Sequence, residues 1–157
     1  MKGEPAAFDA ALGHCLAKLR QRDLLEAELA DSLALRNYPP EVVEQVLTWL
    51  REKGLVNDRR AIIAYAATFT GRRARGSQAV RRALIERGAP QGLIDECLGE
   101  DTPRAEELSK ACEALSAKFG ERKDRARAGR FLESRGFEEG LVELAVEIFC
   151  GCLESNA

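Results

Sequence analysis

The sequence predicts an all-α protein made of three tandem three-helix modules that form an elongated, curved body. Composition, the lack of strand patterns and an internal repeat support this fold class. Of the 157 residues, 45% are hydrophobic, only 6% are aromatic and five are proline. Ala, Leu, Glu and Arg are abundant, which favours helices over sheets. No run of alternating polar and apolar residues indicates a strand.

A segment that occurs three times sets the length of the modules. Residues 80–98 resemble residues 128–146 after a shift of 48 positions, and a shift back of 51 positions gives a third copy at 33–47. Each copy contains a Leu and an Arg followed by Gly or Asn, at Asn37, Gly88 and Gly136. Gly and Asn accept the left-handed conformation just beyond a helix end. Each copy therefore predicts a helix, a left-handed turn and a second helix.

A further helix precedes each copy, which gives three helices per module. In the first module we expect helices at 6–20, 24–36 and 40–53, each burying one apolar stripe. Further helix starts are expected at Asn57 with Asp58, at Ser77, and at Thr102 followed by Pro103. The modules are placed at 1–54, 55–100 and 101–157. Their period of roughly 50 residues does not fit the 34-residue helical hairpin repeats.

Charge is unevenly distributed, although the net charge is only −2. Between positions 71 and 87, six arginines accompany a single acidic residue, and seven basic residues lie between positions 118 and 135. After Arg135 the chain has five glutamates and no basic residue. This segregation of charge suits a charged partner.

Some of the basic residues are predicted to form a docking face. On helical wheels, Arg81 and Arg82 point away from the apolar stripe of their helix, and so do Arg127 and Arg130. Arginine binds both phosphates and carboxylates through paired hydrogen bonds. A solvated, ion-paired surface explains the same pattern equally well. The candidate partner- or DNA-binding residues are Arg72, Arg73, Arg75, Arg81, Arg82, Arg122, Lys123, Arg125, Arg127 and Arg130.

No arrangement of residues typical of catalysis or cofactor binding is recognisable. Segment 71–77 lacks the residue order of a phosphate-binding loop. The paired glutamates at 106–107 and 138–139 lie where carboxylates favour the first turn of a helix. The five cysteines are expected to be reduced and mostly buried, and Cys150 with Cys152 lacks the further ligands of a zinc site. The sequence predicts no enzyme activity, no cofactor and no bound metal.

Two single residues are interpreted as structural: the histidine as a surface or core-edge residue, and the tryptophan as a core or core-edge residue. They are His14, the one histidine, and Trp49, the one tryptophan, for which an interface role is the alternative. The longest apolar stretch, 61–69, is too short to span a membrane. The N-terminus also lacks the pattern of a secretory signal. We therefore expect a cytoplasmic protein without membrane association.

Short motifs follow one another at characteristic spacings along nearly the whole chain. They are Glu28 with Leu29, segment 54–60 (GLVNDRR), Arg75 with Gly76, Arg87 with Gly88, and segment 131–137 (FLESRGF). In their order and spacing, these motifs resemble the RecX family, regulators of the bacterial RecA recombinase. Four positions depart from the family's pattern. Leu25 replaces a capping Ser or Thr, Asn57 the first acid of a pair, Ala61 an aromatic residue and Ala83 a Glu.

The resemblance implies a regulatory protein that docks in the groove of the RecA–DNA filament. Such a protein limits filament extension or promotes disassembly, and so restrains ATP hydrolysis and strand exchange. We expect it to act as a monomer. The alternative is a helical protein that binds single- or double-stranded DNA directly, and weakly, through its arginine-rich surfaces. A helical scaffold for another partner is the third possibility.

Overall fold

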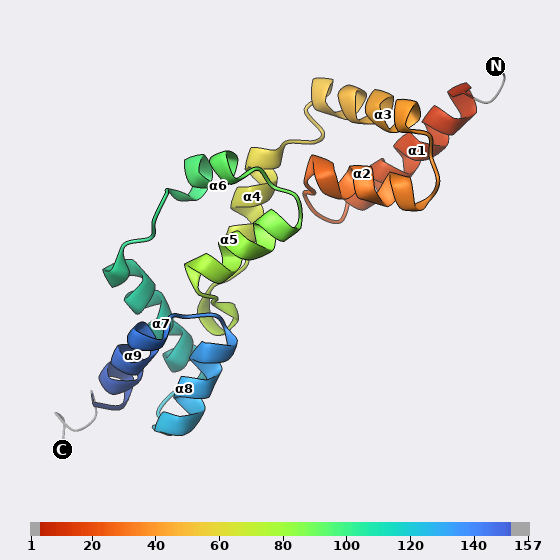
Figure 1. Ribbon diagram of the computed structural model, residues 1–157. Coiled ribbons are helices and arrows are strands. Elements are labelled where there is room, and N and C mark those ends of the chain that lie inside the picture. The colour runs from red at the N-terminus through yellow and green to blue at the C-terminus, as the bar shows by residue number, and fades with distance from the viewer. Residues whose placement is uncertain (1–3, 152–157) are drawn as a thin grey trace. The chain divides into compact units, whose positions relative to one another are not determined.

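The structure, a computed structural model, describes residues 4–151 (Figure 1). This part of the chain forms nine α-helices and one short 3-10 helix and contains no strand, which confirms the all-α prediction. It divides into two compact units. Unit 1 comprises residues 4–64 and 84–97, and unit 2 comprises residues 65–83 and 98–151. Among the described helices, none is both long and apolar enough to cross a membrane.

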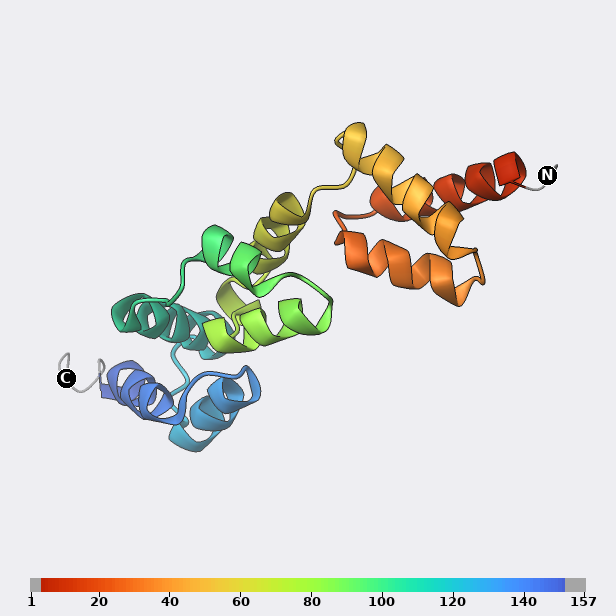
Figure 2. The same cartoon turned by 45° about the horizontal axis from the view of Figure 1, so that its top comes forward.

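Three helices at the start of the chain enclose the core of unit 1. They are α1 (Glu4–Leu19), α2 (Glu26–Leu35) and α3 (Pro40–Glu52), and their bounds lie within two residues of those predicted. α3 packs against both α1 and α2 (Figure 2). Leu29, Leu33, Val46 and Leu50 are completely buried at a spacing of four residues within each helix, which is the apolar stripe that the periodicity predicts. Most of α4 (Asp58–Ala67) and α6 (Gln91–Leu98) also belong to this unit.

The first turn of α2 is capped by a residue of α4. Leu25 occupies the N-cap position of α2 and makes no side-chain capping bond. Instead, the backbone N–H of Glu26 donates to Oδ1 of Asp58 at 2.7 Å. Asn57 caps α4, as predicted, because its Oδ1 accepts the N–H of Arg60 at 3.1 Å. The side-chain acceptor that Leu25 lacks is thus supplied in part from another helix.

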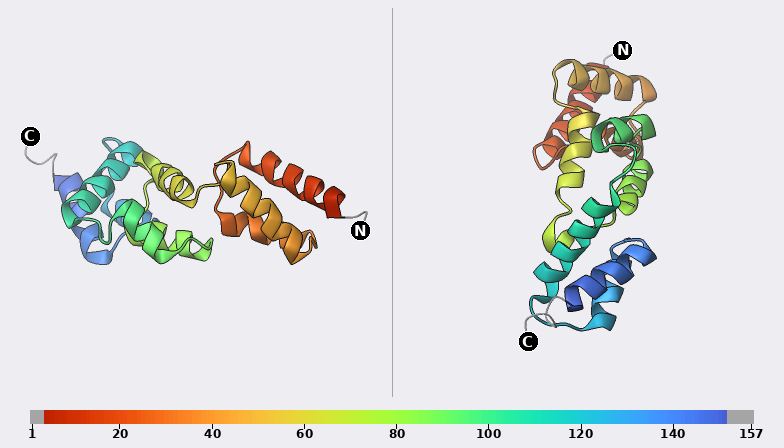
Figure 3. Two further views of the ribbon diagram at one scale, coloured as in Figure 1. Left: turned by 90° about the horizontal axis from the view of Figure 1, so that it is seen from above. Right: turned by 90° about the vertical axis from the view of Figure 1, so that its left-hand side faces the viewer.

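Unit 2 is built around α7 (Arg104–Phe119). This helix contacts the 3-10 helix η1 (Gly71–Arg73), α8 (Arg125–Ser134) and α9 (Glu139–Gly151), and α8 also packs on α9 (Figure 3). The first part of α5 (Ser77–Glu86) belongs to the same unit. Leu115, Leu132 and Ala145 are completely buried in its core. Unit 2 thus has an apolar core of its own.

Two of the predicted helix starts need correction. Ser77 does not cap α5 but is its first residue, and its N–H donates to a carboxylate oxygen of Glu107 at 2.7 Å. The N-cap of α7 is Pro103 rather than Thr102, and no side chain caps that end. At the start of α5, the carboxylate of Glu107, which is distant in the sequence, thus supplies the acceptor that was expected from Ser77.

The three predicted left-handed turns are confirmed, with φ of 62° at Asn37, 96° at Gly88 and 79° at Gly136. Two of them also lie very close to a helix of the preceding repeat. A Cβ added to Gly88 would lie 2.6 Å from Cβ of Ala27, and one added to Gly136 would lie 2.5 Å from Cβ of Ala79. The same kind of turn-on-helix contact therefore occurs once in each unit. The module boundaries at 54 and 100 stay a prediction, because the compact units are defined by packing rather than by sequence repetition.

Candidate partner-binding surface

All ten predicted binding residues belong to unit 2. Their exposure divides them into three groups. Arg81 is buried, Arg75 and Lys123 are half-buried, and the others are exposed. We call these exposed residues the basic surface; they are Arg72, Arg73, Arg82, Arg122, Arg125, Arg127 and Arg130.

Arg81 was expected on the solvent side of α5, and the structure corrects this expectation. Its side chain is only 7% exposed, and its guanidinium donates a hydrogen bond to the carbonyl oxygen of Gly99. A helical wheel shows only the apolar stripe within α5. It cannot show that the segment after α6 covers a second side of this helix. Arg81 therefore holds that segment in place and is not available to a partner.

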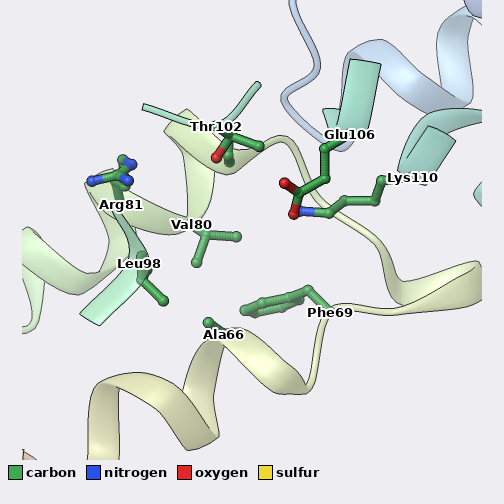
Figure 4. Close-up of a pocket in the computed structure, with 9 residues that line it drawn as sticks. Ala66, Phe69, Val80, Arg81, Leu98, Thr102, Glu106 and Lys110 are labelled. Carbon is green, nitrogen blue, oxygen red and sulfur yellow. The ribbon is translucent and has the colours of Figure 1, made fainter. Parts of the chain in front are cut away.

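A small pocket of about 130 Å³ lies beside Arg81 (Figure 4). Its apolar lining includes Phe69, Val80 and Leu98, while Thr102 and Glu106 contribute polar groups. Pockets for small-molecule ligands usually enclose roughly 300–1,000 Å³. This pocket is smaller, and we assign no cofactor to it.

The C-terminal end of α7 brings two groups of basic residues together. η1, which carries Arg72 and Arg73, packs on α7, and a Cβ on the first residue of η1 would lie 4.0 Å from Cβ of Ala117. The loop with Arg122 and Lys123 leaves the same end of α7. Carbonyl groups give a helix C-terminus partial negative charge, which favours cations there.

α8 presents the third group of basic residues as predicted. Arg125, Arg127 and Arg130 are exposed, whereas Ala128 and Leu132 are completely buried. The helix is capped by Asp124, whose Oδ1 accepts the N–H of Arg127 at 3.0 Å. Oδ2 of the same carboxylate lies 3.4 Å from the guanidinium of Arg127. Arg125 and Arg130 make no ion pair within the described residues.

Two of the predicted residues are held over aromatic rings. Nζ of Lys123 lies 3.6 Å from the ring centroid of Phe149, and the guanidinium carbon of Arg75 lies 5.3 Å from that of Phe69. Cations are attracted to ring faces at these distances. Arg75 and Lys123 therefore have structural partners, which explains their partial burial.

Sequence reasoning missed two basic residues that flank one ring. Lys118 and Arg135 lie on Phe131, at 5.9 Å and 5.2 Å from its centroid. The spacing of four residues between Phe131 of α8 and Arg135, the C-cap residue of that helix, could have indicated this contact. Lys118 comes from α7, and no local pattern connects it with Phe131. These cations extend the positive charge of unit 2 beyond the predicted set.

The histidine and the most buried cysteine belong to unit 1. Nε2 of His14 lies 2.8 Å from Oγ of Ser32, and burial, followed by the charges of Arg36 and Lys18, lowers the pKa of His14. Burial raises the pKa of the Cys15 thiol, which disfavours the reactive thiolate. His14 is half-buried, which agrees with its interpretation as a surface or core-edge residue.

The other cysteines are only partly covered by the structure. Cys150 is buried, Cys97 and Cys112 are half-buried, and none of these three forms a disulfide. Cys152, the second residue of the predicted C-x-C pair, lies outside the described residues. Within residues 4–151, no group of three or more His, Cys, Asp or Glu side chains is placed to hold a metal ion.

Comparison with known proteins identifies relatives that match most of the chain. No family model matches it. The protein named regulatory protein RecX in Thermus thermophilus is 37% identical over 134 residues, which cover 84% of this chain and 87% of that protein. Its namesake in Leptothrix cholodnii is 32% identical over 142 residues, covering 87% of both chains. The one in Deinococcus radiodurans is 35% identical over 144 residues, covering 88% of this chain and 67% of that protein.

Solved structures show the same fold. The crystal structure of RecX from Lactobacillus salivarius superposes with a TM-score of 0.66 at 16% identity and covers 94% of this chain and 97% of that chain. A second crystal structure, of a regulatory protein RecX, gives a TM-score of 0.63 at 22% identity and covers 88% of this chain and 72% of that chain. With relatives above 30% identity that align over most of their own length, the chain belongs to the RecX family of regulatory proteins.

Proposed function

We propose that this protein regulates the RecA recombinase by binding the RecA–DNA filament and limiting its extension, ATP hydrolysis and strand exchange. The observation that carries the proposal is membership of the RecX family, with 37% identity to one member over 84% of the chain. The basic surface of unit 2 supplies the chemistry. Its arginines suit phosphates of the filament's DNA or carboxylates of its protein.

The availability of these arginines supports a role in binding. Arg72, Arg73, Arg125 and Arg130 are exposed, and none of them has an acidic partner within 4 Å in the described part of the chain. An exposed arginine without a partner loses little on meeting a phosphate or carboxylate, because no existing ion pair has to be broken. Binding at this surface should therefore be sensitive to salt.

The test is an assay of RecA, single-stranded DNA and ATP to which the purified protein is added. We expect slower ATP hydrolysis and shorter filaments. Replacing Arg125, Arg127 and Arg130 by Ala should raise the concentration needed for half-maximal inhibition about tenfold or more, which corresponds to about 1.4 kcal/mol of binding. The fold should persist, because these side chains lie off the apolar stripe.

A matched control removes the same charge from unit 1. Lys18, Arg20 and Arg36 are exposed there, and their replacement by Ala should change inhibition little. An equal loss of RecA inhibition in both triple variants would show that net charge, and not the basic surface, governs binding. A parent protein without effect on ATP hydrolysis or filament length would contradict the proposed function itself.

Direct DNA binding is the second candidate, favoured by the exposed arginines of η1 and α8. The net charge of −2 opposes strong binding to bare DNA, because five glutamates follow the last basic residue. If the arginines contact phosphates, the triple variant should lose affinity for bare DNA, and its salt dependence should flatten by about one unit per lost contact. If they contact acidic residues of the recombinase, only filament binding should fall.

A further inference from the structure

Unit 1 has a groove of opposite character, formed where α1 packs against α3. It encloses about 410 Å³ and is open to solvent. We call it the acidic groove. Its lining residues are Phe8 from α1 and Glu41, Glu44, Gln45, Thr48, Trp49 and Glu52 from α3.

The apolar part of the acidic groove consists of two aromatic side chains. Phe8 and Trp49 are half-buried and pack against the core of unit 1. Nζ of Lys53 lies 5.8 Å from the centroid of the Trp49 ring. The Trp49 ring thus attracts a basic side chain of the chain itself, so its chemistry suits the stem or charge of an Arg or Lys.

The rim of the groove is acidic because three glutamates share one side of α3. At 100° per residue, Glu41, Glu44 and Glu52 fall within about 80° of one another, on the side away from the buried stripe. All three are exposed, and no basic side chain lies within 4 Å of their carboxylates in the described residues. Their charge is therefore not neutralised by ion pairs.

Several other acidic residues of unit 1 have basic partners. Glu26 pairs with Arg51, and Oδ1 of Asp23 lies 2.8 Å from Nε of Arg60. Glu96 accepts a hydrogen bond from Arg59 at 2.6 Å. The rim of the groove is thus a local concentration of unpaired negative charge, which contrasts with these paired acids of the same unit.

We propose that the acidic groove binds a basic segment of a protein partner. The aliphatic stem of an Arg or Lys of that segment lies on Phe8 and Trp49, and its charge meets the three glutamates. Nucleic acid is excluded as the occupant because its phosphates would be repelled by the same carboxylates. The inference deepens the proposed function, on which it rests for the identity of the partner: the recombinase supplies the basic segment, while the basic surface contacts anionic groups.

Trp49 provides a direct test, since it is the single tryptophan of the chain. The probe is a synthetic helical peptide with four arginines along one face, and the control peptide carries glutamates at the same positions. We expect a saturable change of Trp49 fluorescence with the arginine peptide and no change with the glutamate peptide. The dissociation constant should rise at least tenfold when Glu41, Glu44 and Glu52 are replaced by Gln.

A second triple variant controls for net charge. Glu133, Glu143 and Glu147 are exposed in unit 2. Their replacement by Gln should leave the dissociation constant of the arginine peptide within about twofold of that of the parent. A twofold change corresponds to a difference in binding free energy of less than RT. Circular dichroism checks that both variants are folded. No response of Trp49 to the arginine peptide, or the same response in the groove variant, would overturn the inference.

Sedimentation with RecA–DNA filaments separates the inference from the proposed function. Weaker binding of the folded Glu41, Glu44 and Glu52 variant, with the unit 2 variant unchanged, supports the assignment of the basic segment to the recombinase. If the parent and the groove variant sediment equally well with filaments, the inference fails and the proposed function stands. If the parent does not sediment but Trp49 still reports the arginine peptide, the proposed function fails and the groove stands as a site for basic segments.

Self-association of the parent that the groove variant abolishes would identify a second copy as the occupant and overturn the assignment.

Discussion

Arg81 and Arg82 are consecutive residues of α5, but only Arg82 is exposed to a partner. Arg81 is 7% exposed and donates to the carbonyl oxygen of Gly99. We predict that Arg81→Ala lowers the free energy of unfolding by about 1–3 kcal/mol, because packing of the stem and a hydrogen bond from a charged group are both lost. Arg82→Ala should change it by about 0.5 kcal/mol or less. Urea unfolding followed by circular dichroism measures both, and equal effects would refute the distinction.

His14 gives the stability of unit 1 a predictable pH dependence. Its pKa in the folded state is lowered, first by burial and then by Arg36 and Lys18, whereas the unfolded chain has a histidine pKa of about 6.5. The folded state therefore takes up this proton less readily than the unfolded chain. The contribution to stability is present above the unfolded pKa and is lost as the pH falls through the folded pKa.

The test of this dependence compares the parent with His14→Gln at pH 7.5 and pH 5.5. No other side chain of the chain is a histidine, so few groups titrate in this range. We expect the free energy of unfolding of the parent to fall more than that of the variant between the two pH values. Parallel changes in parent and variant would show that His14 is not linked to folding.

At the level of elements, the repeated contact of a glycine turn with a preceding helix should limit substitution. Gly136 has a positive φ of 79°, and an added Cβ would lie 2.5 Å from Cβ of Ala79. We predict that Gly136→Ala lowers the free energy of unfolding by roughly 1–3 kcal/mol, through backbone strain and steric overlap. The control is Gly129→Ala within α8, where no atom lies within 4 Å of the added Cβ. That change should stabilise the protein by up to about 1 kcal/mol, because Ala has the higher helix propensity.

A double variant separates the two causes of the loss at Gly136. Adding Ala79→Gly removes the overlapping Cβ but leaves the positive φ at position 136. The free energy of unfolding, corrected for Ala79→Gly alone, should therefore recover in part and not in full. Absence of any recovery would mean that backbone strain alone explains the loss.

The elements themselves were largely predictable because their signals are local. The turns at Asn37, Gly88 and Gly136 follow from residues that tolerate positive φ, and the first three helices follow from apolar periodicity. Capping was less predictable, since Asp58 and Glu107 cap helices that are distant in the sequence. A local pattern cannot show an acceptor that folding brings in from elsewhere.

At the level of the whole molecule, the candidate surface was predictable where one helix decides exposure. Arg127 and Arg130 are exposed on α8 as the helical wheel predicts. Arg81 was placed wrongly because a non-adjacent segment covers it, and Lys118 was missed because its aromatic partner lies on another helix. The acidic groove was also missed, since it requires Phe8 of α1 to lie beside α3. What remained unpredicted in each case is a contact between elements.

The two apolar cores share no residue, so a cavity in one should act mainly on its own unit. In tandem helical repeats, stability is approximately a sum of local terms and terms between neighbours.

Leu132 is completely buried in unit 2, and Leu132→Ala should lower the free energy of unfolding of that unit by about 2–5 kcal/mol. We predict a large decrease in the unfolding midpoint followed by circular dichroism and a smaller decrease in the midpoint followed by Trp49 fluorescence, which reports on unit 1. Leu33→Ala, at a completely buried site of unit 1, should instead lower the Trp49 midpoint by the larger amount. Equal shifts of both signals in both variants would show that the described helices unfold as one cooperative body.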